Sequence, residues 1–229
     1  MSIKTLLLAT LLLTAGTSLA QNAQDFAGLK RYAADNTKLG QPAKGEKRVV
    51  FLGNSITEGW VSQRPEFFRS HGYIGRGISG QTSYQFLLRF REDVLNLQPK
   101  VLVLNAATND IAENTGPYSE DITFGNIQTM TELARAHKIK VILTSTLPAR
   151  NFGWRPNITD GMKKIRSLNA RIKEYAKKNK LQYVDYFSAM LAPDGEGMDS
   201  RYTPETVHPN AEGYKVMERL IVPAIEKEL

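Results

Sequence analysis

The chain has 229 residues, and its 41% hydrophobic and 23% charged residues are ordinary for a globular protein, which excludes a disordered or fibrous chain. It has no cysteine, so disulfides, thiol nucleophiles and lipid modification of a cysteine are excluded. The basic residues behind the formal charge of +7 are scattered, without a basic stripe or interleaved aromatic residues, so we expect no nucleic-acid partner.

Residues 1–20 have the pattern of a secretory signal peptide. A positive start at Lys4 precedes the apolar stretch 6–13 and the small-residue sequence SLA at 18–20. Because this stretch is well short of the roughly 20 residues that span a bilayer, we expect cleavage after Ala20 rather than a membrane anchor. We therefore predict an exported protein, periplasmic or secreted, whose mature chain has no integral membrane segment.

Residues 21–45 are polar, and we expect an N-terminal arm or linker with one short helix at 26–34. A single domain is predicted over 46–229, where apolar runs of strand length alternate with amphipathic stretches. The predicted strands are residues 48–52, 73–75, 101–105, 141–145 and 183–184. The amphipathic stretches place apolar residues three and four positions apart, as in Phe86, Phe90 and Val94.

The runs are apolar throughout, which is typical of strands buried on both faces of a parallel sheet. Strict alternation of strand and helix implies right-handed crossovers and an α/β three-layer sandwich. We predict a flavodoxin-like, doubly wound, five-stranded parallel sheet with the strand order 2-1-3-4-5.

Two polar clusters follow strands 1 and 3, between which the strand order of such a sheet reverses. Ligands bind outside the carboxyl ends of the strands at this point. The first cluster is Gly53-Asn54-Ser55, and the second runs over residues 107–110. Ser55 is either the N-cap of the following helix or a nucleophile, because serine is also a preferred capping residue.

A nucleophilic serine needs a base, and the chain has three histidines. His208 precedes Pro209, and proline is favoured in the first turn of a helix, so His208 falls in the loop that leads into the last helix. That loop can lie at the same edge of the sheet as Ser55. Surface and core positions are the alternative for any single histidine.

A nucleophilic serine also needs donors for an oxyanion. The N–H of Ser55 at a helix N-terminus, the N–H of Gly80 and the side-chain amide of Asn109 are the candidates. A turn glycine and an Asx turn are the alternatives for the last two.

Together these residues resemble the SGNH, or GDSL-like, hydrolase superfamily over about residues 47–226. Its four blocks appear in order, as Gly53-Asn54-Ser55 followed by ITEGW, as GISG at 77–80, as ATND at 107–110, and as residues 205–208. The resemblance implies ester hydrolysis through an acyl-serine intermediate, with no metal or organic cofactor. It makes Ser55 the nucleophile, His208 the general base and then acid, and Ser55, Gly80 and Asn109 the oxyanion hole.

Three positions depart from the family pattern. Asn54 stands where aspartate is common, and Ala107 replaces the usual glycine of the third block. Glu205 occupies the position of the aspartate three residues before the histidine, where a carboxylate orients the imidazole. Glu205 is either the third member of a catalytic triad or points elsewhere, in which case the site is a Ser-His dyad.

The resemblance implies a carbohydrate O-acetylesterase or a lipid-directed esterase, and aromatic and basic side chains favour a small-acyl, above all acetyl, ester on a carbohydrate. Trp60 follows the nucleophile block, and Trp154 and Arg155 lie in the loop after strand 4, so these three side chains are the candidates for substrate contact. The competing interpretations are core packing for Trp60 and a loop anchor for Trp154. The alternatives are a lipid-directed esterase, such as a lysophospholipase or thioesterase, and a non-catalytic glycan-binding module. The oligomeric state stays open.

Overall fold

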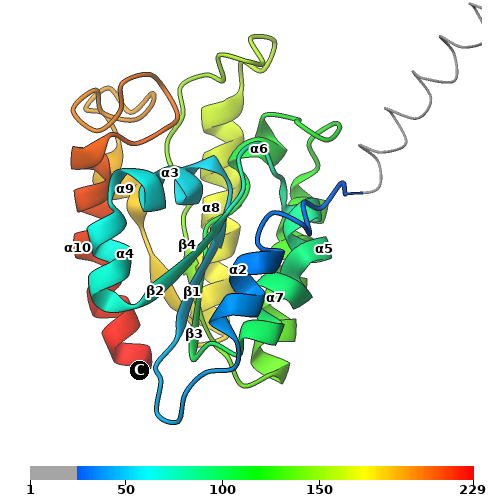
Figure 1. Ribbon diagram of the computed structural model, residues 1–229. Helices are drawn as coiled ribbons and strands as arrows, with labels where there is room; N and C mark the ends of the chain where they lie inside the picture. Colours follow the sequence, from blue (N-terminus) through cyan, green and yellow to red (C-terminus); the bar gives the residue numbers. More distant parts are fainter. Residues whose placement is uncertain (1–24) are drawn as a thin grey trace, which may run out of the picture.

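The computed structural model describes residues 25–229, and the predicted signal peptide lies outside them. Five parallel strands form one sheet in the order β2-β1-β3-β4-β5, which confirms the predicted fold class (Figure 1). The strands are β1 (Val49–Gly53), β2 (Tyr73–Gly77), β3 (Val101–Leu104), β4 (Lys140–Thr144) and β5 (Gln182–Val184).

Helices form a layer on each side of this sheet (Figure 1). One layer contains α5 (Ser83–Asp93), α7 (Glu120–Ala136) and α8 (Gly161–Lys178). The other contains α3 (Ser55–Gln63), α4 (Pro65–His71), α9 (Tyr186–Met190) and α10 (Ala211–Glu228). The remaining helices are α2 (Ala33–Leu39), the short α6 (Thr108–Ile111) and the 3-10 turn η1 (Leu95–Leu97).

Each strand contributes side chains to two separate hydrophobic cores. In β1, Val50 and Leu52 face the cluster under α5, α7 and α8, whereas Val49 and Phe51 face the cluster under α3, α4 and α10. Every residue of β1 is buried. The strands are therefore apolar at every position because both faces of the sheet are covered by helices.

The helix expected at 26–34 begins later, at Ala33. The chain turns first, because the carboxylate of Asp25 accepts hydrogen bonds from the backbone N–H groups of Leu29 and Lys30 and Gly28 has a φ of +68°. The segment then crosses the free edge of β2, where the hydroxyl of Tyr32 donates to the carbonyl of Gly77.

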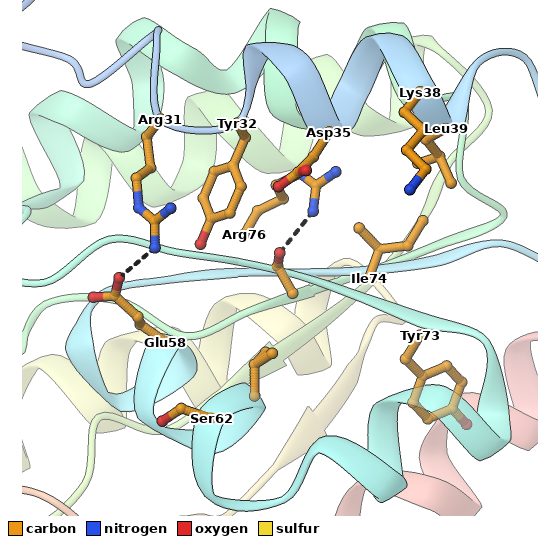
Figure 2. Close-up of a pocket in the computed structure, with 12 residues that line it drawn as sticks. Arg31, Tyr32, Asp35, Lys38, Leu39, Glu58, Ser62, Tyr73, Ile74 and Arg76 are labelled. Carbon is orange, nitrogen blue, oxygen red and sulfur yellow. Dashed lines mark hydrogen bonds and ion pairs between the residues drawn. The ribbon is translucent and has the colours of Figure 1, made fainter.

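A cavity of about 750 Å³ lies between this segment and the edge of β2 (Figure 2). The N-terminal segment contributes Arg31 and Lys38 to its lining. Helix α3 contributes Glu58, and β2 contributes Tyr73 and Arg76. The guanidinium of Arg76 covers the edge by donating to the carbonyl of Gly75. Within the described part of the chain, no helix is long and apolar enough to span a membrane.

Candidate active site

The first three sequence blocks follow β1, β2 and β3, which are neighbours in the sheet. The loops are joined directly: the N–H of Ile78 donates to the carbonyl of Gly53, and the side-chain amide of Asn109 donates to the carbonyl of Gln81 at 3.0 Å. Parallel strands end at one edge, so the three blocks form a single polar surface at the carboxyl ends of the strands.

Ser55 is the first residue of α3, and Asn54 is the N-cap. The side-chain oxygen of Asn54 accepts from the N–H of Ile56 at 3.0 Å, so the capping role that sequence alone allowed for Ser55 is filled by its neighbour. The hydroxyl of Ser55 is half-buried and free for another partner. An uncharged asparagine in place of the family's aspartate therefore still caps the helix.

The partner of the Ser55 hydroxyl is His208, whose Nε2 lies 2.8 Å from Ser55 Oγ. The loop that carries His208 is held by Thr203, whose hydroxyl donates to the carbonyl of His208. The helix that follows the loop is joined to α3, because the hydroxyl of Tyr214 donates to the carbonyl of Ile56 at 2.8 Å. Long-range contacts thus bring together two residues that are 153 positions apart in sequence.

Glu205 approaches the other imidazole nitrogen, with its Oε1 2.6 Å from His208 Nδ1. Because the carboxylate can only accept, this contact assigns the Nδ1–H tautomer, in which Nε2 accepts a hydrogen bond from the Ser55 hydroxyl. The carboxylate also accepts from the backbone N–H groups of Thr206, Val207 and His208. The side chain therefore curls back over its own turn, and the turn takes up the extra methylene of glutamate.

The pKa of Glu205 is lowered from the ordinary value of a glutamate. Partial burial raises it, but the hydrogen bonds from the backbone of Thr206 and from His208 together outweigh this effect. The carboxylate is thus held in its charged form beside the imidazole. Its side chain is still 42% exposed, so solvent screens this interaction.

Two backbone N–H groups in the first two sequence blocks have no acceptor in the described part of the chain. Among the described residues, neither the N–H of Ser55 nor that of Gly80 donates to another group of the protein. Gly80 has a φ of +78°, a conformation that glycine adopts without steric cost. The amide of Asn109 uses one of its two hydrogens for Gln81, which leaves the other available.

The third block carries backbone strain at Ala107, which has a φ of +84°. A left-handed conformation favours glycine, the residue that the family pattern leads one to expect here. Asp110 from the same block is buried and accepts from the N–H and hydroxyl of Ser83, which ties this block to the start of α5. Burial raises the pKa of Asp110, although the hydrogen bonds from Ser83 oppose this.

The expectation that Trp60 contacts substrate is contradicted by its burial. Its side chain is 2% exposed and lies between the rings of Phe67 and Tyr214, with its Nε1 donating to Glu218. Trp60 points into the hydrophobic core under α3 because it is five positions after Ser55 and so lies on another face of the helix.

Trp154 is exposed and lies beside the site. Its ring centroid is 6.3 Å from that of His208, and its Nε1 donates to the side-chain oxygen of Asn114 at 2.9 Å. Arg155 is half-buried, and its Nε has no hydrogen-bond partner among the described residues. Of the two tryptophans, Trp60 is buried, and Trp154 is the one that a bound molecule can reach.

The region next to Glu205 mixes polar side chains with the apolar Ala192, Pro193 and Met198. A cavity of about 460 Å³ adjoins Glu205 and is lined also by Arg150, Asp194, Asp199 and Ser200. Within residues 25–229, no three His, Asp or Glu side chains gather in a way that could hold a metal ion.

Residues 51–216 match the sequence model of the GDSL-like lipase/acylhydrolase family. The chain belongs to this family. It is 62% identical to a GDSL-like lipase from Bacteroides thetaiotaomicron VPI-5482, with a TM-score of 0.88 over 90% of this chain and 100% of that chain. Another similar structure is an acetyl xylan esterase, AlAXEase, at 25% identity and a TM-score of 0.63 over 77% of this chain and 98% of that chain.

A further relative of this GDSL-like protein is the uncharacterized lipoprotein YqeF of Bacillus subtilis (strain 168). The two are 32% identical over 126 residues, which are 48% of this chain and 52% of the relative. The match thus spans about half of that relative's length.

Two polar residues of this GDSL-like site carried no predicted role. Glu58 stands three positions after Ser55 and bonds to Ser79, and Asn114 bonds to both Gly80 and Trp154. Glu58 lies inside the first block, so its position was visible in the sequence. Nothing in the sequence marks Asn114, because its partners lie in loops that only the fold brings together.

Proposed function

We propose that this protein is an exported serine esterase that removes small acyl groups, above all acetyl, from carbohydrates. The observation that carries the proposal is the continuous chain from Ser55 Oγ to His208 Nε2 at 2.8 Å and from His208 Nδ1 to Glu205 Oε1 at 2.6 Å. Nucleophile, base and orienting carboxylate are the three groups that acyl transfer through a serine requires.

In the proposed reaction Ser55 Oγ attacks the ester carbonyl while His208 Nε2 takes the hydroxyl proton. The carbonyl oxygen becomes an oxyanion, which the N–H groups of Ser55 and Gly80 and the amide of Asn109 stabilise. The protonated His208 then gives its proton to the departing sugar hydroxyl, which leaves an acyl-serine. His208 then takes a proton from a water molecule as that water attacks the acyl carbon. When the tetrahedral intermediate collapses, His208 returns this proton to the departing Ser55 Oγ, which releases the carboxylic acid, ionised to carboxylate in water, and restores the free enzyme.

Glu205 has two tasks in this scheme. It accepts the Nδ1–H of His208, which turns Nε2 toward Ser55, and its negative charge stabilises the imidazolium that forms during each half-reaction. The lowered pKa of Glu205 keeps that charge present near neutral pH.

The surroundings of the site support a carbohydrate rather than a lipid. Trp154 offers an exposed aromatic face next to His208, and the cavity beside Glu205 includes charged and hydroxyl groups such as Arg150, Asp194 and Ser200 in its lining. Sugars bind through such combinations of an aromatic face and polar partners. The similarity to an acetyl xylan esterase supports the same substrate class.

Export is supported by the signal-like residues 1–20 and by a relative whose name describes it as a lipoprotein. Because this chain has no cysteine, the proposed exported enzyme is not held by a lipid on a cysteine.

A serine-directed fluorophosphonate tests the catalytic proposal. We expect the probe to add one label to the protein, detected as a mass increase, and no label to the Ser55→Ala variant. A wild-type protein that stays unlabelled under the same conditions contradicts a catalytic serine and favours a glycan-binding module.

Two substrate series test the acyl and alcohol preferences. We expect hydrolysis of p-nitrophenyl esters to fall from acetate to octanoate, and acetate to be released from acetylated xylo-oligosaccharides. Activity that rises steadily with acyl length contradicts the acetylesterase proposal in favour of a lipid-directed esterase.

A further inference from the structure

The loop that carries Gly80 is held from two sides by polar side chains. On one side the carboxylate of Glu58 accepts from the backbone N–H of Ser79 at 2.9 Å and from the Ser79 hydroxyl. On the other side the side-chain amide of Asn114 donates to the carbonyl of Gly80 at 3.0 Å. Both residues are half-buried, and Ser79 and Gly80 are exposed.

These two contacts lie on either side of the peptide that carries the Gly80 N–H. The N–H of Gly80 belongs to the peptide between Ser79 and Gly80, and its direction changes with ψ of Ser79 and φ of Gly80. Glu58 fixes the preceding peptide and Asn114 fixes the following one. The turn itself is closed by the backbone N–H of Gln81, which donates to the carbonyl of Ile78 at 3.3 Å, and no side chain packs against Gly80, whose φ is +78°. Glu58 and Asn114 add to this single backbone restraint.

Glu58 is itself firmly placed. It lies in the first turn of α3, the helix that begins at Ser55, and it accepts from Arg31 at 3.0 Å across the cavity beside β2 (Figure 2). Partial burial raises the pKa of Glu58, but hydrogen bonds from Ser79 and Arg31 outweigh this and lower it. Glu58 thus ties the loop that carries Gly80 to the helix that begins with Ser55.

Asn114 is placed by the opposite side of the site. Its backbone N–H donates to the carbonyl of Asn109 at 3.0 Å, and its side-chain oxygen accepts from Trp154 Nε1 at 2.9 Å. One residue therefore touches Gly80, Asn109 and the exposed tryptophan, and both its side-chain nitrogen and its side-chain oxygen have a partner.

We propose that Glu58 and Asn114 are a pair of positioning residues that orient the Gly80 N–H toward the oxyanion. The proposal rests on the proposed function, in which that N–H stabilises the tetrahedral intermediate. An oxyanion forms only during the reaction, so a misdirected donor slows turnover and leaves ground-state binding intact.

Steady-state kinetics with p-nitrophenyl acetate test the pair. Removing a whole oxyanion donor typically costs about 100- to 1,000-fold in kcat, so we expect a misdirected donor to cost about 10-fold in Glu58→Ala and in Asn114→Ala, with KM changed less than about 2-fold. The double variant should lose much less than the product of the two, because either change frees the same peptide.

Conservative variants separate positioning from folding. Glu58→Gln keeps an oxygen for the Ser79 N–H and should recover most of the kcat lost in Glu58→Ala. Asn114→Asp still accepts from Trp154 but cannot donate to Gly80, so it should stay as slow as Asn114→Ala. Glu66→Ala and Asn96→Ala remove an exposed glutamate and an exposed asparagine elsewhere and should match wild type.

An NMR measurement that needs no turnover keeps this proposal apart from the proposed function. The ¹⁵N order parameter of the Gly80 amide should be that of an ordered backbone in wild type and should fall in Glu58→Ala and Asn114→Ala, whether or not any ester is hydrolysed. An unchanged order parameter in both variants overturns the positioning role, as does Asn114→Asp with wild-type kcat. A wild type that is neither active nor labelled overturns only the proposed function.

Discussion

Glu205 Oε1 lies 2.6 Å from His208 Nδ1 although the two residues are only three positions apart and glutamate is one methylene longer than the aspartate usual in this family. The same carboxylate accepts three backbone N–H groups of its own turn, from Thr206, Val207 and His208. The longer side chain is therefore used to cap the turn and to reach the imidazole at once.

Substitutions of Glu205 should separate its charge from its reach. We expect Glu205→Gln to lower kcat by about 100-fold or more, because the imidazolium loses its counter-charge. Glu205→Asp keeps the charge but is too short to cap the turn and to reach Nδ1 together, so we expect a smaller loss. A Glu205→Gln variant with kcat close to wild type indicates a Ser-His dyad. Turnover of p-nitrophenyl acetate is the measurement.

The lowered pKa of Glu205 predicts a pH-dependent contribution to stability. A carboxylate whose folded pKa is lower than its unfolded pKa of about 4.3 stabilises the fold above that pH, and the contribution disappears as pH falls through the folded pKa. We expect wild type to melt above Glu205→Gln at pH 7 and the two to converge in acid. The difference is small because the side chain is 42% exposed. A Tm difference that is constant from pH 7 to acid contradicts this.

Trp60 should matter for stability. Its side chain is 2% exposed between Phe67 and Tyr214, and Trp60→Ala should cost about 3–5 kcal/mol in the free energy of unfolding. Urea unfolding followed by circular dichroism measures this loss. A Trp60→Ala variant as stable as wild type contradicts its placement in the core.

Trp154 should matter for substrate. Trp154→Ala is expected to leave the free energy of unfolding within about 0.5 kcal/mol of wild type, because the residue is exposed. We expect KM for an acetylated xylo-oligosaccharide to rise by about 10-fold, the loss of about 1.4 kcal/mol, and KM for p-nitrophenyl acetate to change little. A rise in KM of the same size for both substrates indicates that Trp154 does not contact the sugar.

Ala107 offers a stabilising substitution. Its φ of +84° is a conformation that costs an L-residue about 1–2 kcal/mol, and Ala107→Gly removes that cost while adding some freedom to the unfolded chain. We expect a net gain of up to about 1 kcal/mol, measured by urea unfolding. Lys138, which also has a positive φ but lies far from the site, provides the matched control Lys138→Gly.

Hydrophobic patterns along the chain predicted most of the fold. Apolar runs such as 101–105 and 141–145 predicted buried parallel strands, and the structure has β3 at Val101–Leu104 and β4 at Lys140–Thr144. This works because a strand covered on both faces must be apolar at successive positions, which is a local property. The helix expected at 26–34 lies instead at Ala33–Leu39. The chain forms turns before it, because the carboxylate of Asp25 accepts from the backbone N–H of Leu29 and Gly28 has a positive φ.

For the site, the sequence by itself determined which chemical groups are present and near which strand ends they lie: Ser55, Gly80, Asn109 and His208. Only the tertiary structure decided how Glu205 reaches His208, that Trp60 is buried while Trp154 is exposed, and that Asn114 joins Gly80 to Trp154. The physical reason is that strand and helix patterns are local, whereas the direction of a side chain depends on packing and hydrogen-bond partners far away in the chain.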